Sequence, residues 1–218
     1  MEKDVVNKLI FKSGMTAKDY KFEQEIPQRP NPLGLSKWLS KEIEEVVQQI
    51  DLIEEEFDVK CSCSKGCSAC CSQLIAVAMS ECLAIKPYIE NLSKDERENL
   101  KKKVLEQCKI LEENNITNKG INTTRNETVI QDKYFKLKMP CVFLNEEKSC
   151  SIYKVRPSLC WSYRNYGDNS DCEKDYDVES TIKYGDWEHR VFERILTARP
   201  THKGLYVLPF AIKEMMGW

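Results

Sequence analysis

The stretch CSCSKGCSACC, residues 61–71, places five cysteine thiols within eleven residues. Packing does not require this many thiols, because a buried cysteine acts only as a small hydrophobe. The pattern is typical of a disulfide framework, a metal site or a redox-active dithiol. The whole chain has 11 cysteines and 2 histidines, so any large metal site in it must be dominated by thiolate ligands.

The spacing within this stretch indicates how its thiols can be shared. Cys67 and Cys70 form a C-x-x-C pair directly after Gly66, a spacing that lets a tight turn direct two sulfurs at one ion. Cys63 lies four residues before Cys67, so a helical turn would place both on one face. Cys70 and Cys71 are adjacent, and their side chains diverge in any regular secondary structure. The adjacent pair therefore favours different metal ions, or different corners of one cluster, over a single tetrahedral ion.

A second group of cysteines follows about seventy residues later, at Cys141, Cys150, Cys160 and Cys172. Neither group alone offers both the ligands and the apolar surroundings that a stable cluster needs. We therefore expect the two groups to fold together around one shared site.

The expected environment favours metal binding over disulfides. The chain begins with acidic MEKD and no apolar core, so no secretory signal is expected. The longest apolar run, LIAVAM at residues 74–79, is far shorter than the ~20 residues of a membrane span. We therefore expect a cytoplasmic protein with no membrane partner, and disulfides are rare in that reducing compartment. The odd number of cysteines also argues against a fully paired framework. The net charge of −2 gives no reason to expect a nucleic-acid partner.

The segments that must position these thiols are predicted to be mainly helical. Apolar residues from Trp38 to Phe57 recur at three- and four-residue steps, which predicts a core-facing helix capped by Ser36. Upstream, a turn-rich stretch with three prolines and Gly34 follows a short amphipathic segment around residues 5–11. We therefore divide the chain into an N-terminal segment and linker (1–34) and a helical cysteine-cluster domain (35–218).

Further helices are predicted between and after the two cysteine groups. One begins at Ser80 and runs to about residue 92 despite Pro87, and another begins with the capping box SKDE at residues 93–96. Residues 114–128 are polar and are expected to form a surface loop outside the core. Pro209 is expected to begin a final helix. The predicted fold is thus a small, mainly α domain with irregular loops organised around a cysteine-ligated metal site.

Two cysteine patterns together resemble a known family. The first is C-x3-C-x2-C-C, beginning at Cys63. The second is PC-x-F-L followed by C-x-I-Y-x-x-R-P-x-x-C, over residues 140–160. With these motifs the chain resembles the YkgJ-type cysteine-cluster proteins over about residues 59–175. Glu81, ten residues after the double cysteine, also resembles the family pattern.

The resemblance implies a zinc- or iron-chelating domain in which most of these cysteines have metal-directed roles. The implied residues are Cys63, Cys67, Cys70, Cys71, Cys141, Cys150 and Cys160. Cys172 joins this set, although the family spacing varies near that end. The residue after the last motif cysteine is commonly arginine in such proteins, and here it is Trp161. Arg156 and Arg164 remain to offset thiolate charge.

Two kinds of metal centre are compatible with these cysteines. Thiolates suit both zinc and iron–sulfur clusters. Structural zinc takes four ligands, and the adjacent pair with its uneven spacing fits that number poorly. An iron–sulfur cluster tolerates scattered ligands, so we expect one here, with zinc as the alternative. A related domain occurs in bacterial flagellin lysine methylases, which implies iron–sulfur-dependent methyl transfer, although this chain is much shorter and shares only the cysteine pattern.

Two functions of different class stay open. In the first, an iron–sulfur cluster takes part in redox chemistry or in the modification of a protein or peptide substrate. In the second, zinc holds together a non-catalytic module that binds a partner. The surplus of cysteines favours the first, and the lack of a nucleotide motif or catalytic triad favours the second. No catalytic residue can be assigned. His189 and His202 are expected to be structural. Cys82 and Cys108 are expected to be core residues, and Cys61 falls outside the family pattern.

Overall fold

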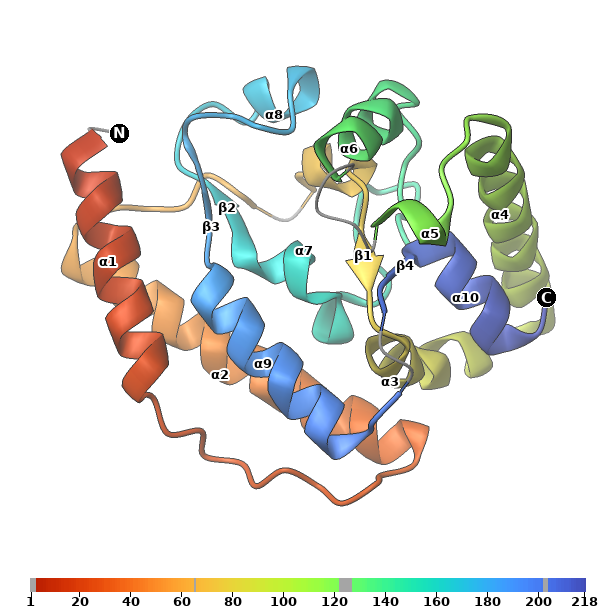
Figure 1. The fold of residues 1–218 in the computed structure, drawn as a ribbon, viewed down its shortest axis with the longest axis horizontal. Helices are drawn as coiled ribbons and strands as arrows, with labels where there is room; N and C mark the ends of the chain where they lie inside the picture. Colours follow the sequence, from red (N-terminus) through yellow and green to blue (C-terminus); the bar gives the residue numbers. More distant parts are fainter. Residues whose placement is uncertain (1–2, 65, 122–126, 202–203) are drawn as a thin grey trace.

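The chain is mainly α-helical, as the sequence predicts (Figure 1). The computed structural model describes residues 3–64, 66–121, 127–201 and 204–218. Its α-helices are α1 (Lys3–Asp19), α2 (Pro32–Glu56), α3 (Met79–Glu90), α4 (Lys94–Glu113), α5 (Asn118–Ile121), α6 (Glu127–Lys136), α7 (Ser158–Ser162), α8 (Asp171–Lys174), α9 (Gly185–Ala198) and α10 (Leu208–Met216). Short 3-10 helices are η1 (Ala69–Ser72) and η2 (Tyr153–Val155), and the strands are β1 (Ala76–Val77), β2 (Tyr163–Asn165), β3 (Thr181–Lys183) and β4 (Tyr206–Val207).

The helices α1, α2 and α9 pack against one another and enclose a first hydrophobic cluster (Figure 1). The predicted apolar stripe of α2 is confirmed, since Ile43, Val46 and Ile50 are all buried in this cluster. Leu9 of α1 and Val191 of α9 pack against them. Burial of this kind stabilises the fold by ~25 cal/mol per Å² of apolar surface removed from water.

The helices α3, α4 and α10 enclose a second hydrophobic cluster, which also includes the chain around Val142, Phe143 and Ile152. Antiparallel pairing of β1 with β4 (Ala76↔Val207) brings the starts of α3 and α10 together. Pro209 lies in the first turn of α10, as predicted. A second antiparallel pair, β2 with β3, continues directly from α7.

Residues 114–128 are only in part the surface loop that was expected. Ile116 is fully buried, and α5 carries the buried Ile121. Both belong to a third hydrophobic cluster with Leu111 of α4 and Tyr134 of α6. The expectation was wrong here because two isolated isoleucines are buried by distant helices, which local polarity does not show. Residues 122–126 lie outside the described part of the chain.

The predicted helix starts are partly confirmed. The capping box at the start of α4 is present, since the Glu96 N–H and carboxylate bond to Ser93. The cap predicted at Ser36 is wrong, because Asn31 accepts the Gly34 N–H at 2.8 Å and the helix begins at Pro32. The proline preorganises the first turn and has no N–H to satisfy. The division of the chain at residue 34 stays a prediction.

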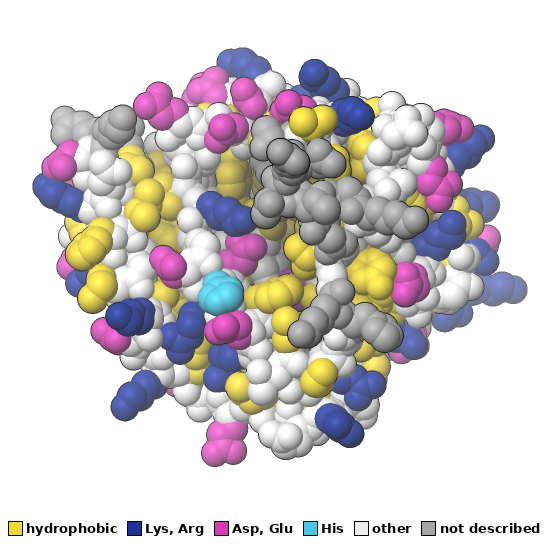
Figure 2. Space-filling model, viewed as in Figure 1, with side chains coloured by type: hydrophobic (Ala, Val, Ile, Leu, Met, Phe, Trp, Pro, Cys, Tyr) yellow, Lys and Arg dark blue, Asp and Glu magenta, His cyan; other side chains and the backbone are white. Residues whose placement is uncertain are grey.

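Charged side chains of both signs are interspersed over the face shown in Figure 2. Hydrophobic side chains reach the surface over α1, where Ile10, Phe11 and Met15 are exposed. Within the described ranges, every helix is too short or too polar to cross a bilayer.

Candidate metal centre

The first cysteine segment is an irregular loop that ends in η1. Gly66 has a φ of +94°, a left-handed conformation that glycine adopts without strain. The turn is closed by the Cys67 N–H, which donates to the Ser64 carbonyl at 2.9 Å. Residues 61–64 and 66–68 are not helical. Cys67 lies near Cys63: burial raises the pKa of the Cys67 thiol, and the charge of Cys63 adds to this.

The second cysteine group meets the first through the backbone. The Cys141 N–H donates to the Cys71 carbonyl at 2.8 Å. Cys141 and Cys150 lie on the two arms of a short hairpin, closed by a β-bridge between Leu144 and Cys150. The structure thus brings the two groups together, as predicted. The role of each thiol as a ligand stays a prediction.

Cys70 lies where the two groups join. Burial, followed by the charges of Cys150 and Cys70, raises the pKa of the Cys141 thiol to about 12. Burial also raises the pKa of Cys160, where Cys141, Cys70 and Cys150 add to it. On the other side, burial and then the charges of Cys63, Cys67 and Cys70 raise the pKa of Cys172 to about 11. Among the described thiols, Cys70 therefore lies near Cys141 and Cys160 and also near Cys67 and Cys172.

The thiols can therefore be described as two sets with different surroundings. We define the inner group as Cys70, Cys71, Cys141, Cys150 and Cys160. We define the outer group as Cys61, Cys63, Cys67 and Cys172. Cys141, Cys150 and Cys160 of the inner group pack against the second hydrophobic cluster, whereas Cys63 is exposed. Cys82 and Cys108 are buried core residues of that cluster, as predicted.

Positive charge lies beside each group. Arg156 lies within electrostatic reach of Cys150 and Cys160, stacks on the Tyr153 ring at 3.8 Å and donates to the Tyr153 carbonyl. Trp161, where arginine is common in similar proteins, is buried in the first hydrophobic cluster. Arg156 is therefore the cation that can offset thiolate charge in the inner group.

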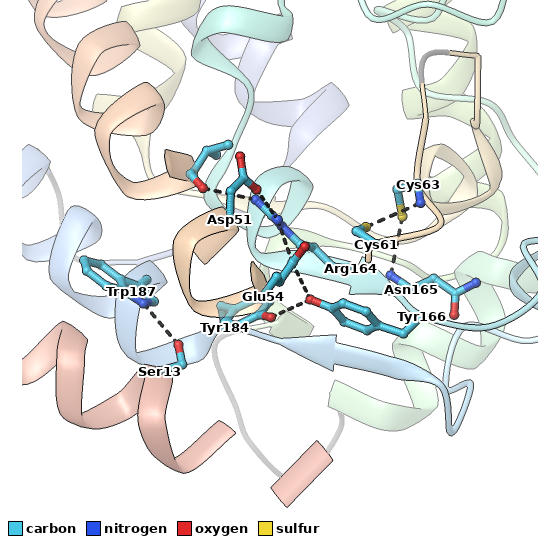
Figure 3. A network of polar contacts seen from close by, with 11 residues as sticks. Ser13, Asp51, Glu54, Cys61, Cys63, Arg164, Asn165, Tyr166, Tyr184 and Trp187 are labelled. Atoms are coloured by element: carbon cyan, nitrogen blue, oxygen red, sulfur yellow. Dashed lines mark hydrogen bonds and ion pairs between the residues drawn. The ribbon is translucent and has the colours of Figure 1, made fainter. Parts of the chain in front are cut away.

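Arg164 on β2 forms a partly buried network near the outer group (Figure 3). Its Nη1 donates to Asp51 Oδ1 and to Glu54 Oε1, each at 2.6 Å. The Tyr166 hydroxyl also donates to Glu54 and bonds to the Tyr184 hydroxyl. Glu54 is only 6% exposed, so this carboxylate is buried together with its partners. The network anchors the C-terminal end of α2 to the strand that follows α7.

Glu81 positions the short helix α7, which carries Cys160. Its carboxylate accepts the Ala78 N–H at 2.9 Å, and it also accepts the Ser158 N–H at 2.9 Å and the Ser158 hydroxyl at 2.8 Å. Glu81 is 3% exposed; burial raises its pKa, and these hydrogen bonds act in the opposite direction. One carboxylate therefore joins the starts of α3 and α7.

A small cavity of about 10 Å³ lies beside the inner group, lined in part by Cys71, Cys141 and Gln107. Its size matches roughly one water molecule. The Gln107 Nε2 donates to the Pro140 carbonyl at 2.7 Å, whereas its buried Oε1 has no partner among the described residues. Gln107 could not be selected from the sequence, because an isolated glutamine on a helix belongs to no motif.

The donor set fits a soft metal by its chemistry. All eleven cysteines are described, and each has a free thiol. Thiolates in apolar surroundings with a guanidinium beside them are the donors that zinc and iron–sulfur clusters prefer. In the described part of the chain, however, no three His, Cys, Asp or Glu side chains are already arranged to hold an ion. His189 is an exposed residue 3.2 Å from Glu193, and His202 lies outside the described residues.

The fold and this site define a mainly α-helical protein built around gathered, free cysteine thiols of the kind that bind metals. Residues 62–179, just over half of the chain, match the CxxCxxCC family, described as a "putative zinc- or iron-chelating domain". The chain belongs to this family. No curated protein and no solved structure matches it.

Proposed function

We propose that this metal-binding protein carries an iron–sulfur cluster in its inner group. Cys70, Cys141, Cys150 and Cys160 would hold it, with Cys71 adjacent. The observation that carries the proposal is the position of Cys70, which lies among three thiols of the second group beside a hydrophobic cluster. Four cysteines are the usual ligands of a 4Fe–4S cluster, which supplies one-electron transfer when bound.

The residues of the chain around the inner group support this role. Phe143 and Ile152 are buried beside Cys141 and Cys150 and exclude water from the thiols. Arg156 reduces the net charge that several thiolates would build up. A reducing cytoplasm, which we propose as the location, would keep the thiols available for metal.

The proposal includes a protein or peptide as the substrate or redox partner. An open groove of about 560 Å³ lies between α3, α4 and the hairpin of the inner group. Leu100, Phe143 and Ile152 line its apolar part, and Lys103 and Glu146 line its polar part. A mixed lining of this kind suits an extended peptide segment.

The test is the metal content of the full chain purified without oxygen. We expect brown protein with broad absorption near ~400 nm, iron and acid-labile sulfide. Cys160→Ser should lose iron and sulfide together, whereas Cys108→Ser, from the same hydrophobic cluster, should keep both. Colourless protein with stoichiometric zinc and no sulfide would contradict the cluster and favour the zinc-stabilised binding module.

A further inference from the structure

The N-terminal helix α1 is attached to the fold by one of its faces. Leu9, Ser13 and Ala17 follow one another at four-residue steps and are buried, and α1 packs against α2 and α9. The Trp187 Nε1 of α9 donates to the Ser13 hydroxyl at 3.1 Å (Figure 3). Because α1 lies at the edge of the molecule, its opposite face points to solvent in a defined orientation (Figure 1).

This opposite face carries hydrophobic side chains that the fold leaves uncovered (Figure 2). Phe11 is 72% exposed, and Met15, one turn further along, is 46% exposed. Leu52 of α2 is 56% exposed and lies one turn before Glu56, which accepts a hydrogen bond from Lys12 of α1 at 2.9 Å. The apolar surface therefore extends from α1 onto α2, and a patch of this kind is typical of a surface that binds a partner.

The charges on this face are arranged symmetrically about Phe11. Asp4 lies seven residues before Phe11 and Lys18 lies seven residues after it, so the three side chains share one stripe of the helix. Both charged side chains are exposed. At ~1.5 Å per residue, each charge lies ~10 Å along the helix axis from Phe11, on opposite sides of it. Asp4 also contacts Lys8 at 2.6 Å within α1, but an exposed pair of this kind contributes little.

This symmetry favours a second copy of the chain over other partners. A two-fold dimer requires a surface that is complementary to itself. If a second α1 lay antiparallel across the first, the two Phe11 rings would meet and each Asp4 would lie opposite a Lys18. An anionic lipid surface would instead favour a polar face rich in lysine and arginine, whereas α1 also exposes Asp4 and Asp19.

We propose that this protein forms a weak two-fold dimer in which the exposed faces of two α1 helices pack antiparallel. Phe11 lies at the centre of the interface, with Met15 and Leu52 around it and an Asp4–Lys18 ion pair at each end. One pair of helices buries less surface than a standard interface, so the dissociation constant should be on the order of 10–100 µM. The first cysteine of the chain is Cys61, so the helix pair contains no thiol and the dimer is independent of the metal proposed above.

The experiment is analytical ultracentrifugation of the full chain at ~5 to ~500 µM, in a reducing buffer that prevents disulfides between chains. The mass of wild type should rise from that of one chain to that of two over this range. Phe11→Asp should remain a monomer, because it places two carboxylates at the centre of the interface. Leu33→Asp is the matched control and should dimerise like wild type, since Leu33 is 51% exposed at the other end of α2 from Glu56. Circular dichroism checks that every variant is folded.

Charge reversal tests the antiparallel pairing at low salt, where exposed charges are least screened. Asp4→Lys places two positive charges at each end of the interface, and Lys18→Glu places two negative charges there. Each single variant should therefore raise the dissociation constant by about tenfold. The double variant Asp4→Lys with Lys18→Glu restores opposite charges at both ends and should recover most of the wild-type affinity.

Four outcomes would overturn the dimer. Wild type could remain a monomer up to ~500 µM, or a dimer could persist in folded Phe11→Asp. The double charge variant could be as weak as the single variants, which would exclude the antiparallel pairing. Monomeric wild type could instead bind vesicles of phosphatidylcholine with phosphatidylserine, with Phe11→Asp unable to bind, which would assign the face to a membrane. A dimer with the expected variants in protein that contains only zinc, or no metal, would support this inference and count against the proposed cluster alone.

Discussion

Replacing Glu81 with alanine would remove the carboxylate that joins α3 to α7. Three buried or nearly buried donors would lose their acceptor: the Ala78 N–H, the Ser158 N–H and the Ser158 hydroxyl. α7 spans only Ser158–Ser162, and a helix of this length is not stable by itself. We therefore expect Glu81→Ala both to destabilise the fold and to displace Cys160.

The size of the effect follows from the donors left behind. A buried donor without a partner costs about 1–3 kcal/mol. Glu81→Ala leaves three such donors, and water that enters the space of the removed side chain can bond to some of them. The free energy of unfolding should therefore fall by about 3–5 kcal/mol. Ser158→Ala removes only the hydroxyl and should cost about 1 kcal/mol. Glu81→Gln keeps one acceptor oxygen and should lie between these two values.

The assay is urea unfolding combined with metal analysis of each variant. Glu96→Ala is the matched control, because Glu96 also accepts bonds at the start of a helix but is exposed to solvent. It should leave the metal content unchanged and cost much less stability than Glu81→Ala. Wild-type stability and metal content in Glu81→Ala would refute the reasoning.

The pH dependence gives a second measurement on the same residue. Burial raises the pKa of Glu81 in the fold above the value of about 4.3 expected for the unfolded chain. The contribution of its proton to stability is therefore fully present below the unfolded pKa and is lost as pH rises through the folded pKa. The free energy of unfolding of wild type minus that of Glu81→Gln should fall over this window, by at most about 1.4 kcal/mol per pH unit. A difference that rises with pH would contradict the assignment.

Two further predictions concern buried side chains outside the inner and outer groups. Arg194 makes two bonds to Glu42, at 2.6 and 2.9 Å, and Glu42 is 0% exposed. Arg194→Met should therefore lower the free energy of unfolding, measured by urea titration, by about 3–5 kcal/mol, because it leaves the Glu42 carboxylate buried without a partner. The double variant Arg194→Met with Glu42→Gln should regain part of this stability. A double variant as unstable as Arg194→Met would show that the unpaired charge is not the cause. Cys82→Ser should keep its full metal content in elemental analysis, because Cys82 lies in the second hydrophobic cluster and away from the metal centre. It should lower the free energy of unfolding by about 1 kcal/mol. Loss of metal in this variant would indicate that Cys82 is a ligand.

The elements that local chemistry determines could be predicted from the sequence. The apolar stripe of α2 and the capping box at Ser93 depend on residues within a few positions of one another, and both are present. The cap predicted at Ser36 was wrong because the helix begins earlier, with Asn31 as the N-cap and Pro32 in the first turn. The apolar stripe predicts that a helix is present but does not show at which residue it begins.

The gathering of thiols could be predicted from residue type and spacing, because five cysteines within eleven residues are close together in any fold of the chain. The sequence could not determine which thiols face one another. The separation into inner and outer groups depends on the hydrogen bond between Cys141 and Cys71 and on the packing of α8 against η1, which join residues far apart in sequence. In the same way, Glu54 is buried where Arg164, 110 residues away, and the Tyr166 hydroxyl both donate to it. Such pairings are decided by tertiary packing, since a charge can leave water only where the fold supplies its partner.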